Sequence, residues 1–133
     1  MSAETPGILE LTEENFAASI NDHPFAVIDF WAPWCAPCRA FAPTFAAAAA
    51  KHPDVLFAKV DAEAQQGIGA HFNIRSIPTL MVFRGNIIVF AEAGALPASA
   101  LDQVLNAARE LDMEKVRSEI AAQDDTASTA TGN

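Results

Sequence analysis

Two cysteines, Cys35 and Cys38, are separated by two residues in this 133-residue chain, which has no other cysteine. Thiols at this spacing can bond to each other, bind a metal or attack a disulfide in another molecule. A structural disulfide closing so short a ring would contribute only about 2 kcal/mol of loop entropy. A chain of this length with 51% hydrophobic residues can bury a core without that link. We therefore expect the pair to serve metal binding or thiol–disulfide exchange rather than to stabilise the fold as a structural disulfide.

Metal binding is one alternative for the cysteine pair. A structural zinc ion needs four ligands, commonly two cysteine pairs or one pair with two suitably spaced histidines. The three histidines, His23, His52 and His71, are scattered along the sequence and are expected at the surface or in loops. We therefore expect no metal site. A redox-inert binding module, using apolar surface near Trp34 without turnover, remains the alternative to a redox enzyme.

The residues around the pair predict a strand followed by a helix. Residues 25–31 are almost continuously apolar and rich in β-branched and aromatic side chains, which is typical of a strand covered on both faces. A helix is predicted from about Cys35 to Lys51, with Pro37 in its first turn and a kink at Pro43. Cys35 would then lie at the N-terminal end of a helix.

This position predicts how the thiols work. Unpaired backbone N–H groups and the helix dipole favour an anion at a helix N-terminus, so we expect a lowered pKa for Cys35. Cys38 lies one turn later on the same side and can resolve a mixed disulfide. Asp29, in the middle of the apolar strand, is the candidate base for Cys38, because burial raises a carboxyl pKa towards neutrality. The alternative is a buried carboxylate with satisfied hydrogen bonds and no role in catalysis.

The remaining periodicity predicts an α/β domain. Further strands are expected over residues 8–11, 55–60, 79–83 and 87–91, and helices over 12–20, 62–72 and 101–111. The last two strands should form an antiparallel hairpin. This order predicts a central mixed β-sheet flanked by helices on both faces. We assign residues 1–112 to this domain and residues 113–133 to a frayed helical extension that becomes a disordered polar tail from Gln123.

Charge and hydropathy limit the partners and the location. The formal net charge of −9 is opposite to that of a protein that binds nucleic acid or an anionic membrane. No stretch has the roughly 18 uncharged apolar residues of a membrane-spanning helix, and the first ten residues lack the pattern of a signal peptide. We expect a cytoplasmic monomer. In that reducing compartment a close cysteine pair is more often catalytic or metal-binding than structural.

Residues 29–39 resemble the active-site segment of thioredoxins, and they read Asp29-Phe30-Trp31-Ala32-Pro33-Trp34-Cys35-Ala36-Pro37-Cys38-Arg39. Further matches follow in order at Pro43, Lys59, Ile77-Pro78-Thr79 and Gly94-Ala95, so that the resemblance covers about residues 8–112. Two segments are particularly similar to bacterial thioredoxin 2: Cys38-Arg39-Ala40-Phe41-Ala42-Pro43 and Arg75-Ser76-Ile77-Pro78-Thr79. The two additional cysteine pairs of that protein's zinc module do not occur in this sequence.

The resemblance implies a thioredoxin fold and a protein-disulfide reductase. It implies thioredoxin reductase and disulfide-containing proteins as partners, with NADPH used only through the reductase and no cofactor bound. Pro78 would be a cis-proline that exposes the backbone of Ile77 to substrate. The substrate surface would consist of Trp34, Ile77, Pro78, Gly94 and Ala95.

The resemblance also assigns supporting roles. Lys59 would moderate the pKa of Asp29, and Trp31 would pack under the active-site loop. Ala36 stands where thioredoxins usually have glycine, so we predict a modest change in reduction potential with reductase activity retained. Ala36, Pro37 and Ile77 all favour a reductant over an oxidant.

Overall fold

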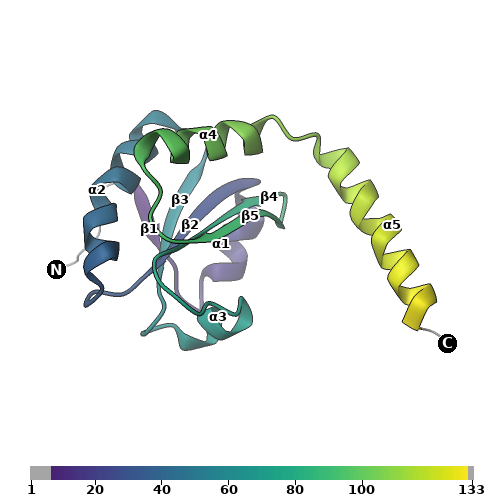
Figure 1. The fold of residues 1–133 in the computed structure, drawn as a ribbon, viewed down its shortest axis with the longest axis horizontal. Helices are drawn as coiled ribbons and strands as arrows, with labels where there is room; N and C mark the ends of the chain where they lie inside the picture. Colours follow the sequence, from purple (N-terminus) through teal and green to yellow (C-terminus); the bar gives the residue numbers. More distant parts are fainter. Residues whose placement is uncertain (1–6, 132–133) are drawn as a thin grey trace.

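The computed structural model describes residues 7–131, in which five strands form one mixed sheet (Figure 1). The order across the sheet is β1-β3-β2-β4-β5. Strands β1, β3 and β2 are parallel, whereas β4 is antiparallel to both β2 and β5. The predicted mixed sheet with a terminal hairpin is confirmed. The strands are β1 (Ile8–Glu10), β2 (Phe25–Trp31), β3 (Leu56–Asp61), β4 (Thr79–Arg84) and β5 (Ile87–Ala93).

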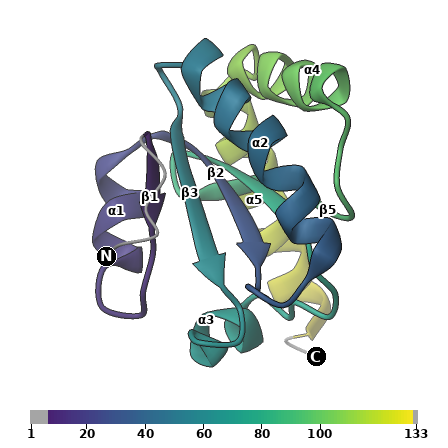
Figure 2. The same ribbon diagram turned by 90° about the vertical axis from the view of Figure 1, so that its left-hand side faces the viewer.

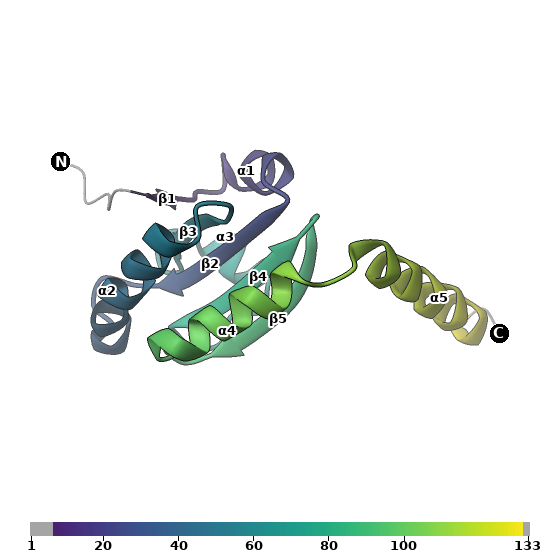
Figure 3. The same cartoon turned by 90° about the horizontal axis from the view of Figure 1, so that it is seen from above.

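Helices cover both faces of this sheet (Figures 2 and 3). One face packs against α2 (Ala36–Lys51) and α4 (Ala98–Arg109), and the other packs against α1 (Phe16–Asp22) and α3 (Gln66–His71). Successive side chains of a strand point to opposite faces, so β2 contributes to two separate cores. Val27 belongs to the core under α2 and α4, whereas Ile28 belongs to the core under α1 and α3. This explains the nearly continuous hydrophobicity of β2.

Helix α1 begins later than predicted, at Phe16 rather than after Thr12. The Thr12 N–H donates to Asn15 Oδ1 at 2.7 Å, and the Asn15 N–H donates to Thr12 Oγ1 at 3.3 Å. These reciprocal bonds close a turn ahead of the helix. Thr12 therefore closes a turn with Asn15 instead of directly preceding the first turn of the helix.

Helix α3 is also shorter than the predicted span of residues 62–72, because a turn precedes it. The N–H groups of Glu63 and Ala64 donate to Asp61 Oδ1 at 3.0 and 3.1 Å. An aspartate that accepts such bonds from the residues following it favours a turn over a helix. The α-helix therefore begins only at Gln66.

Helix α5 (Met113–Thr131) extends away from the sheet beyond α4 (Figures 1 and 3). Met113 is buried and Val116 is half-buried at the start of the helix. The helical backbone reaches Thr131, which differs from the irregular tail predicted from Gln123, and alanine in this stretch favours a helix. Residues 132 and 133 of that predicted tail lie outside the described part. No helix within residues 7–131 is long and apolar enough to cross a bilayer.

Candidate redox site

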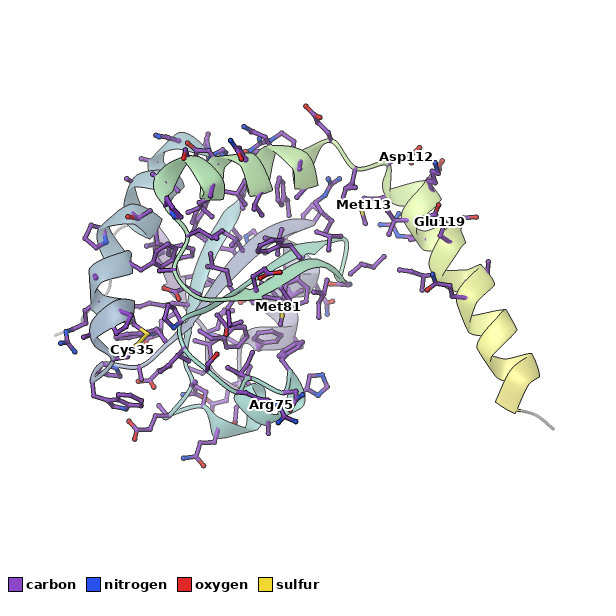
Figure 4. All side chains as sticks on the ribbon, viewed as in Figure 1. Cys35, Arg75, Met81, Asp112, Met113 and Glu119 are labelled. Carbon is purple, nitrogen blue, oxygen red and sulfur yellow. A yellow bond between two sulfur atoms is a disulfide. The ribbon has the colours of Figure 1, made fainter. Side chains whose placement is uncertain are left out.

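The sheet topology brings distant segments to one edge. Because β2 and β3 are parallel, both end at this edge, where the antiparallel strand β4 begins at Thr79. Strand β5 ends there as well, since Ala93 pairs with Thr79. The cysteine loop, the Ile77–Pro78 segment and Gly94 therefore meet. Figure 4 shows Cys35 and its disulfide at the start of α2, on the side of the body away from α5.

Cys35 and Cys38 form a disulfide with their Cα atoms 5.2 Å apart. Cys35 is the N-cap residue of α2, and its Sγ accepts a hydrogen bond of 3.2 Å from the Cys38 N–H. Ala36 and Pro37, the first two helical residues, are exposed, whereas both cysteines are buried. The Cys35 sulfur thus lies where the N–H groups of the helix point. A negative charge on that sulfur in the reduced state is stabilised by this location.

The predicted cis-proline lies beside the disulfide. The Ile77–Pro78 peptide bond is cis, and the Ile77 carbonyl oxygen lies 3.9 Å from Cys35 Sγ. The Gly94 N–H donates to the Pro78 carbonyl at 2.7 Å. Gly94 has a φ of 106°, in the region that only glycine adopts readily. Ile77 thus lies next to Cys35, Gly94 is bonded to the adjoining Pro78, and Ala95 is exposed.

Trp34, the residue before Cys35, has the most exposed large apolar side chain within residues 7–131, at 64%. Its Nε1–H donates to Glu63 Oε1 at 2.8 Å. Sequence reasoning missed Glu63, because the two residues are 29 positions apart and no local motif connects them. Only the parallel pairing of β2 with β3 brings them together.

Asp29 lies in the middle of β2 and is only 4% exposed. Its Oδ1 has no hydrogen-bond partner among residues 7–131. Burial raises the pKa of Asp29 from 3.8 to about 7, while the nearby Lys59 charge lowers it in part. Asp29 lines a cleft of about 150 Å³ together with Cys38 and Lys59. A carboxyl able to exchange a proton near neutral pH therefore shares a cleft with the second cysteine.

Two further side chains support this cleft and the loop above it. Lys59 is the register partner of Asp29 on β3, and its Nζ lies 4.4 Å from the centroid of the Trp31 ring. Trp31 is half-buried beneath the loop. Arg39, the last residue of the segment that resembles thioredoxins, donates from its guanidinium to the Pro33 carbonyl at 2.8 Å. The loop is thus supported from below by Trp31 and tied to α2 by Arg39.

The domain model of the family described as Thioredoxin matches residues 7–107. The chain belongs to the thioredoxin family. It is 50% identical over 115 residues to putative thioredoxin 2 from Streptomyces coelicolor, covering 86% of each protein. It is 44% identical over 99 residues to thioredoxin C-3 from Corynebacterium nephridii, covering 74% of this chain and 68% of that protein.

Solved thioredoxins share the fold of this chain. Oxidised mitochondrial thioredoxin 3 from Saccharomyces cerevisiae superposes with a TM-score of 0.70 at 28% identity, covering 75% of this chain and 94% of that one. The predicted thioredoxin fold is confirmed. With its Cys35–Cys38 disulfide, this thioredoxin is a thiol–disulfide oxidoreductase that acts as a protein-disulfide reductase.

Proposed function

We propose that this thioredoxin reduces protein disulfides with Cys35 as the attacking sulfur and Cys38 as the resolving sulfur. The observation that carries the assignment is the asymmetry of the pair along α2. Cys35 occupies the N-cap position beside Ile77, and although it is itself buried, its chain neighbours Trp34 and Ala36 are exposed. Cys38 lies inside the helix and lines the cleft of Asp29. An attacking sulfur needs access to substrate, and a resolving sulfur needs a base.

The reaction has two exchange steps. The Cys35 thiolate attacks one sulfur of the substrate disulfide, which forms a mixed disulfide and releases the other substrate sulfur as a thiolate. Cys38 then loses its proton and attacks Cys35 Sγ, which releases the second substrate thiolate. Two electrons pass to the substrate, whose two thiolates are protonated. The chain is left with the Cys35–Cys38 disulfide.

Asp29 serves as the base that takes the proton from Cys38. Its pKa of about 7 means that a large fraction of the carboxyl is ionised near neutral pH and able to accept a proton. Lys59 keeps this pKa from rising further, because its positive charge favours the carboxylate. Trp31 supports the loop between this cleft and the surface.

The substrate binds as an extended peptide across Trp34, Ile77, Pro78, Gly94 and Ala95. Trp34 precedes Cys35 and offers exposed apolar area, the Ile77 carbonyl lies near the Cys35 sulfur, and Gly94 is bonded to Pro78. The backbone of Ile77 is available for strand-like pairing with the peptide.

The oxidised form is returned to the dithiol by a thioredoxin reductase that draws electrons from NADPH, so this chain itself needs no bound cofactor. We place it in the cytoplasm as a monomer, since a reductant of other proteins requires a reducing compartment. Its net charge of −9 argues against nucleic acid or anionic membranes as partners.

Insulin reduction with NADPH and a thioredoxin reductase tests the assignment. Wild type turns over, whereas Cys35→Ser loses activity by more than about a thousandfold. Cys38→Ser accumulates a mixed disulfide through Cys35, visible as a covalent adduct that dithiothreitol releases. Equal turnover by wild type and Cys38→Ser would contradict the two-sulfur mechanism. Binding of substrate proteins without any thiol cycling would favour the redox-inert binding module instead.

A further inference from the structure

We propose that Glu63 is a positioning residue that holds the Trp34 ring open beside Cys35 so that substrate can bind. This inference rests on the proposed function. It starts from the hydrogen bond of 2.8 Å between Trp34 Nε1 and Glu63 Oε1. Because the Trp34 side chain is 64% exposed, packing alone fixes its ring poorly. The hydrogen bond is therefore the contact that selects one orientation.

Glu63 is itself held in place, which distinguishes it from an ordinary surface acid. The Glu63 N–H donates to Asp61 Oδ1 at 3.0 Å in the turn after β3. Within the same turn, the Ala62 N–H donates to the Trp31 carbonyl at 2.8 Å, which ties the turn to the end of β2. The carboxylate that receives the indole N–H thus sits on a backbone fixed to the strand that leads into the cysteine loop.

The sheet order gives this anchor a direction. Strand β3, which precedes Glu63, lies on one side of β2, and strand β4, which follows the cis-proline segment, lies on the other side. The bond therefore draws Trp34 away from Ile77 and towards the β3 side of Cys35. A ring without this bond is free to turn across Cys35 towards Ile77. The hydrogen bond to Glu63 therefore keeps Trp34 apart from Ile77, with Cys35 between them.

An ordered ring also lowers the entropy lost on binding. A side chain already held in its bound orientation does not have to be immobilised by the substrate. Losing the anchor should therefore weaken substrate binding by about two- to tenfold while leaving the sulfur chemistry intact. Loss of this hydrogen bond should therefore raise KM and leave kcat nearly unchanged.

The acceptor atom, and not the negative charge, performs this role. Glutamine keeps a side-chain oxygen that accepts a hydrogen bond, so Glu63→Gln should retain the ring position. Alanine removes the acceptor. If Glu63 acted instead by attracting positively charged substrates, Glu63→Gln and Glu63→Ala would be equally impaired.

Steady-state insulin reduction by the full chain provides the first measurement. We expect Glu63→Ala to raise KM by about two- to tenfold with kcat changed less than about twofold, and Glu63→Gln to stay near wild type. Glu92→Ala is the matched control, because Glu92 is an exposed acid on β5 at the same end of the sheet. In a Trp34→Phe background, which keeps a ring but lacks the N–H, adding Glu63→Ala should change KM no further.

The indole N–H resonance of Trp34 in a ¹⁵N-labelled chain provides the second measurement. Glu63→Ala should move this resonance and speed its exchange with water, leaving the Trp31 indole resonance in place. An unchanged KM or an unchanged Trp34 resonance in Glu63→Ala overturns the positioning role. Failure of wild type to reduce insulin overturns the proposed function instead, whatever the resonances show.

Discussion

Buried polar groups near the two ends of helix α2 differ in whether they have hydrogen-bond partners. At its start, Asp29 Oδ1 and Trp31 Nε1 are buried without hydrogen-bond partners among residues 7–131. At its end, His52 is also buried, but Asp102 Oδ1 lies 3.0 Å from its Nε2 and the Arg109 guanidinium lies 2.9 Å from its Nδ1. Leaving a buried polar group unpaired costs about 1 to 3 kcal/mol. The unpaired groups near the start of α2 therefore lower the stability of the fold, whereas the paired His52 at the far end does not.

The carboxyl groups show the same contrast through their pKa values. Burial raises the pKa of Asp29 to about 7. At the far end, hydrogen bonds from Arg109 and from His52 lower the pKa of Asp54 and Asp102 respectively. A raised carboxyl pKa costs stability as the pH rises, and a lowered one adds stability that is lost in acid. The same residue type thus has a pKa suited to proton transfer near neutral pH at one end of α2 and adds stability at the other.

The largest expected effect comes from replacing Asp29, the buried carboxyl near the start of α2. A pKa that rises from 3.8 to about 7 corresponds to a cost of about 4 kcal/mol once the carboxyl is ionised. Asp29→Asn should therefore raise the free energy of unfolding at pH 8 by up to about 4 kcal/mol, and most of this gain should vanish near pH 4. Urea titrations of the oxidised chain at both pH values measure it.

The same variant should lose activity. Without the base for Cys38, insulin reduction at pH 7 should slow by about a hundredfold. Asp102→Asn at the far end is the control, and it should gain no stability at pH 8. A stabilisation of Asp29→Asn that is equal at pH 4 and pH 8 would refute the burial of an ionisable carboxyl as its cause.

The next largest effect should come from removing the Arg109 guanidinium at the far end of α2. Arg109→Met removes the partner of His52 Nδ1 and the two bonds from the guanidinium to Asp54, of 2.8 and 3.0 Å. The unpaired imidazole should lower the free energy of unfolding by about 1 to 3 kcal/mol. Reductase kcat/KM should stay within about twofold, since the site lies at the other end of α2. Arg75→Met, at an exposed arginine, is the control for loss of a guanidinium.

A smaller effect should appear in acid. The stability that Asp54 and Asp102 contribute is present above the ordinary pKa of 3.8 and is lost as the pH falls through their lowered values. Asp54→Asn should therefore flatten the fall in urea midpoint between pH 5 and pH 2.5. The Asp54 side chain is 51% exposed and that of Asp102 is 29% exposed, so solvent screens both charges and this change should be smaller than that of Arg109→Met. An acid limb identical to that of wild type would remove Asp54 from the stabilising network.

A feature near either end of α2 could be predicted from the sequence only where the residues that form it lie close together in the chain. Strand β2, the helix after it and the cysteine pair are local features, with hydrophobicity and spacing visible within residues 25–51, and all were predicted. The pairings of Trp34 with Glu63 and of His52 with Arg109 span 29 and 57 residues. They depend on which strands and helices become neighbours, which no short pattern encodes. His52 lies in the loop just after α2, as expected, but it is buried and its partners Asp102 and Arg109 come from α4.

Helix boundaries were the other weak point. Thr12 and Asp61 both lie where side chains bind nearby backbone N–H groups, and the same chemistry can cap a helix or close a turn. Only the path of the following chain decides between them. The start of α2 was predictable because Pro37 and a buried strand fix that path from both sides.

The smallest effect should come from Ala36, at the first helical position of the redox end. Glycine there loses more conformational freedom on folding than alanine, so Ala36→Gly should lower the free energy of unfolding by about 0.5 to 1 kcal/mol. Only the part of this change that differs between the dithiol and the disulfide alters the reduction potential. The potential should therefore move by no more than about 20 mV. Equilibration with a glutathione buffer measures the shift, and Ala40→Gly, an exposed position farther along α2, is the matched control. A shift several times larger for Ala36→Gly alone would mean that the residue between the cysteines distinguishes the two redox states directly, rather than through helix stability.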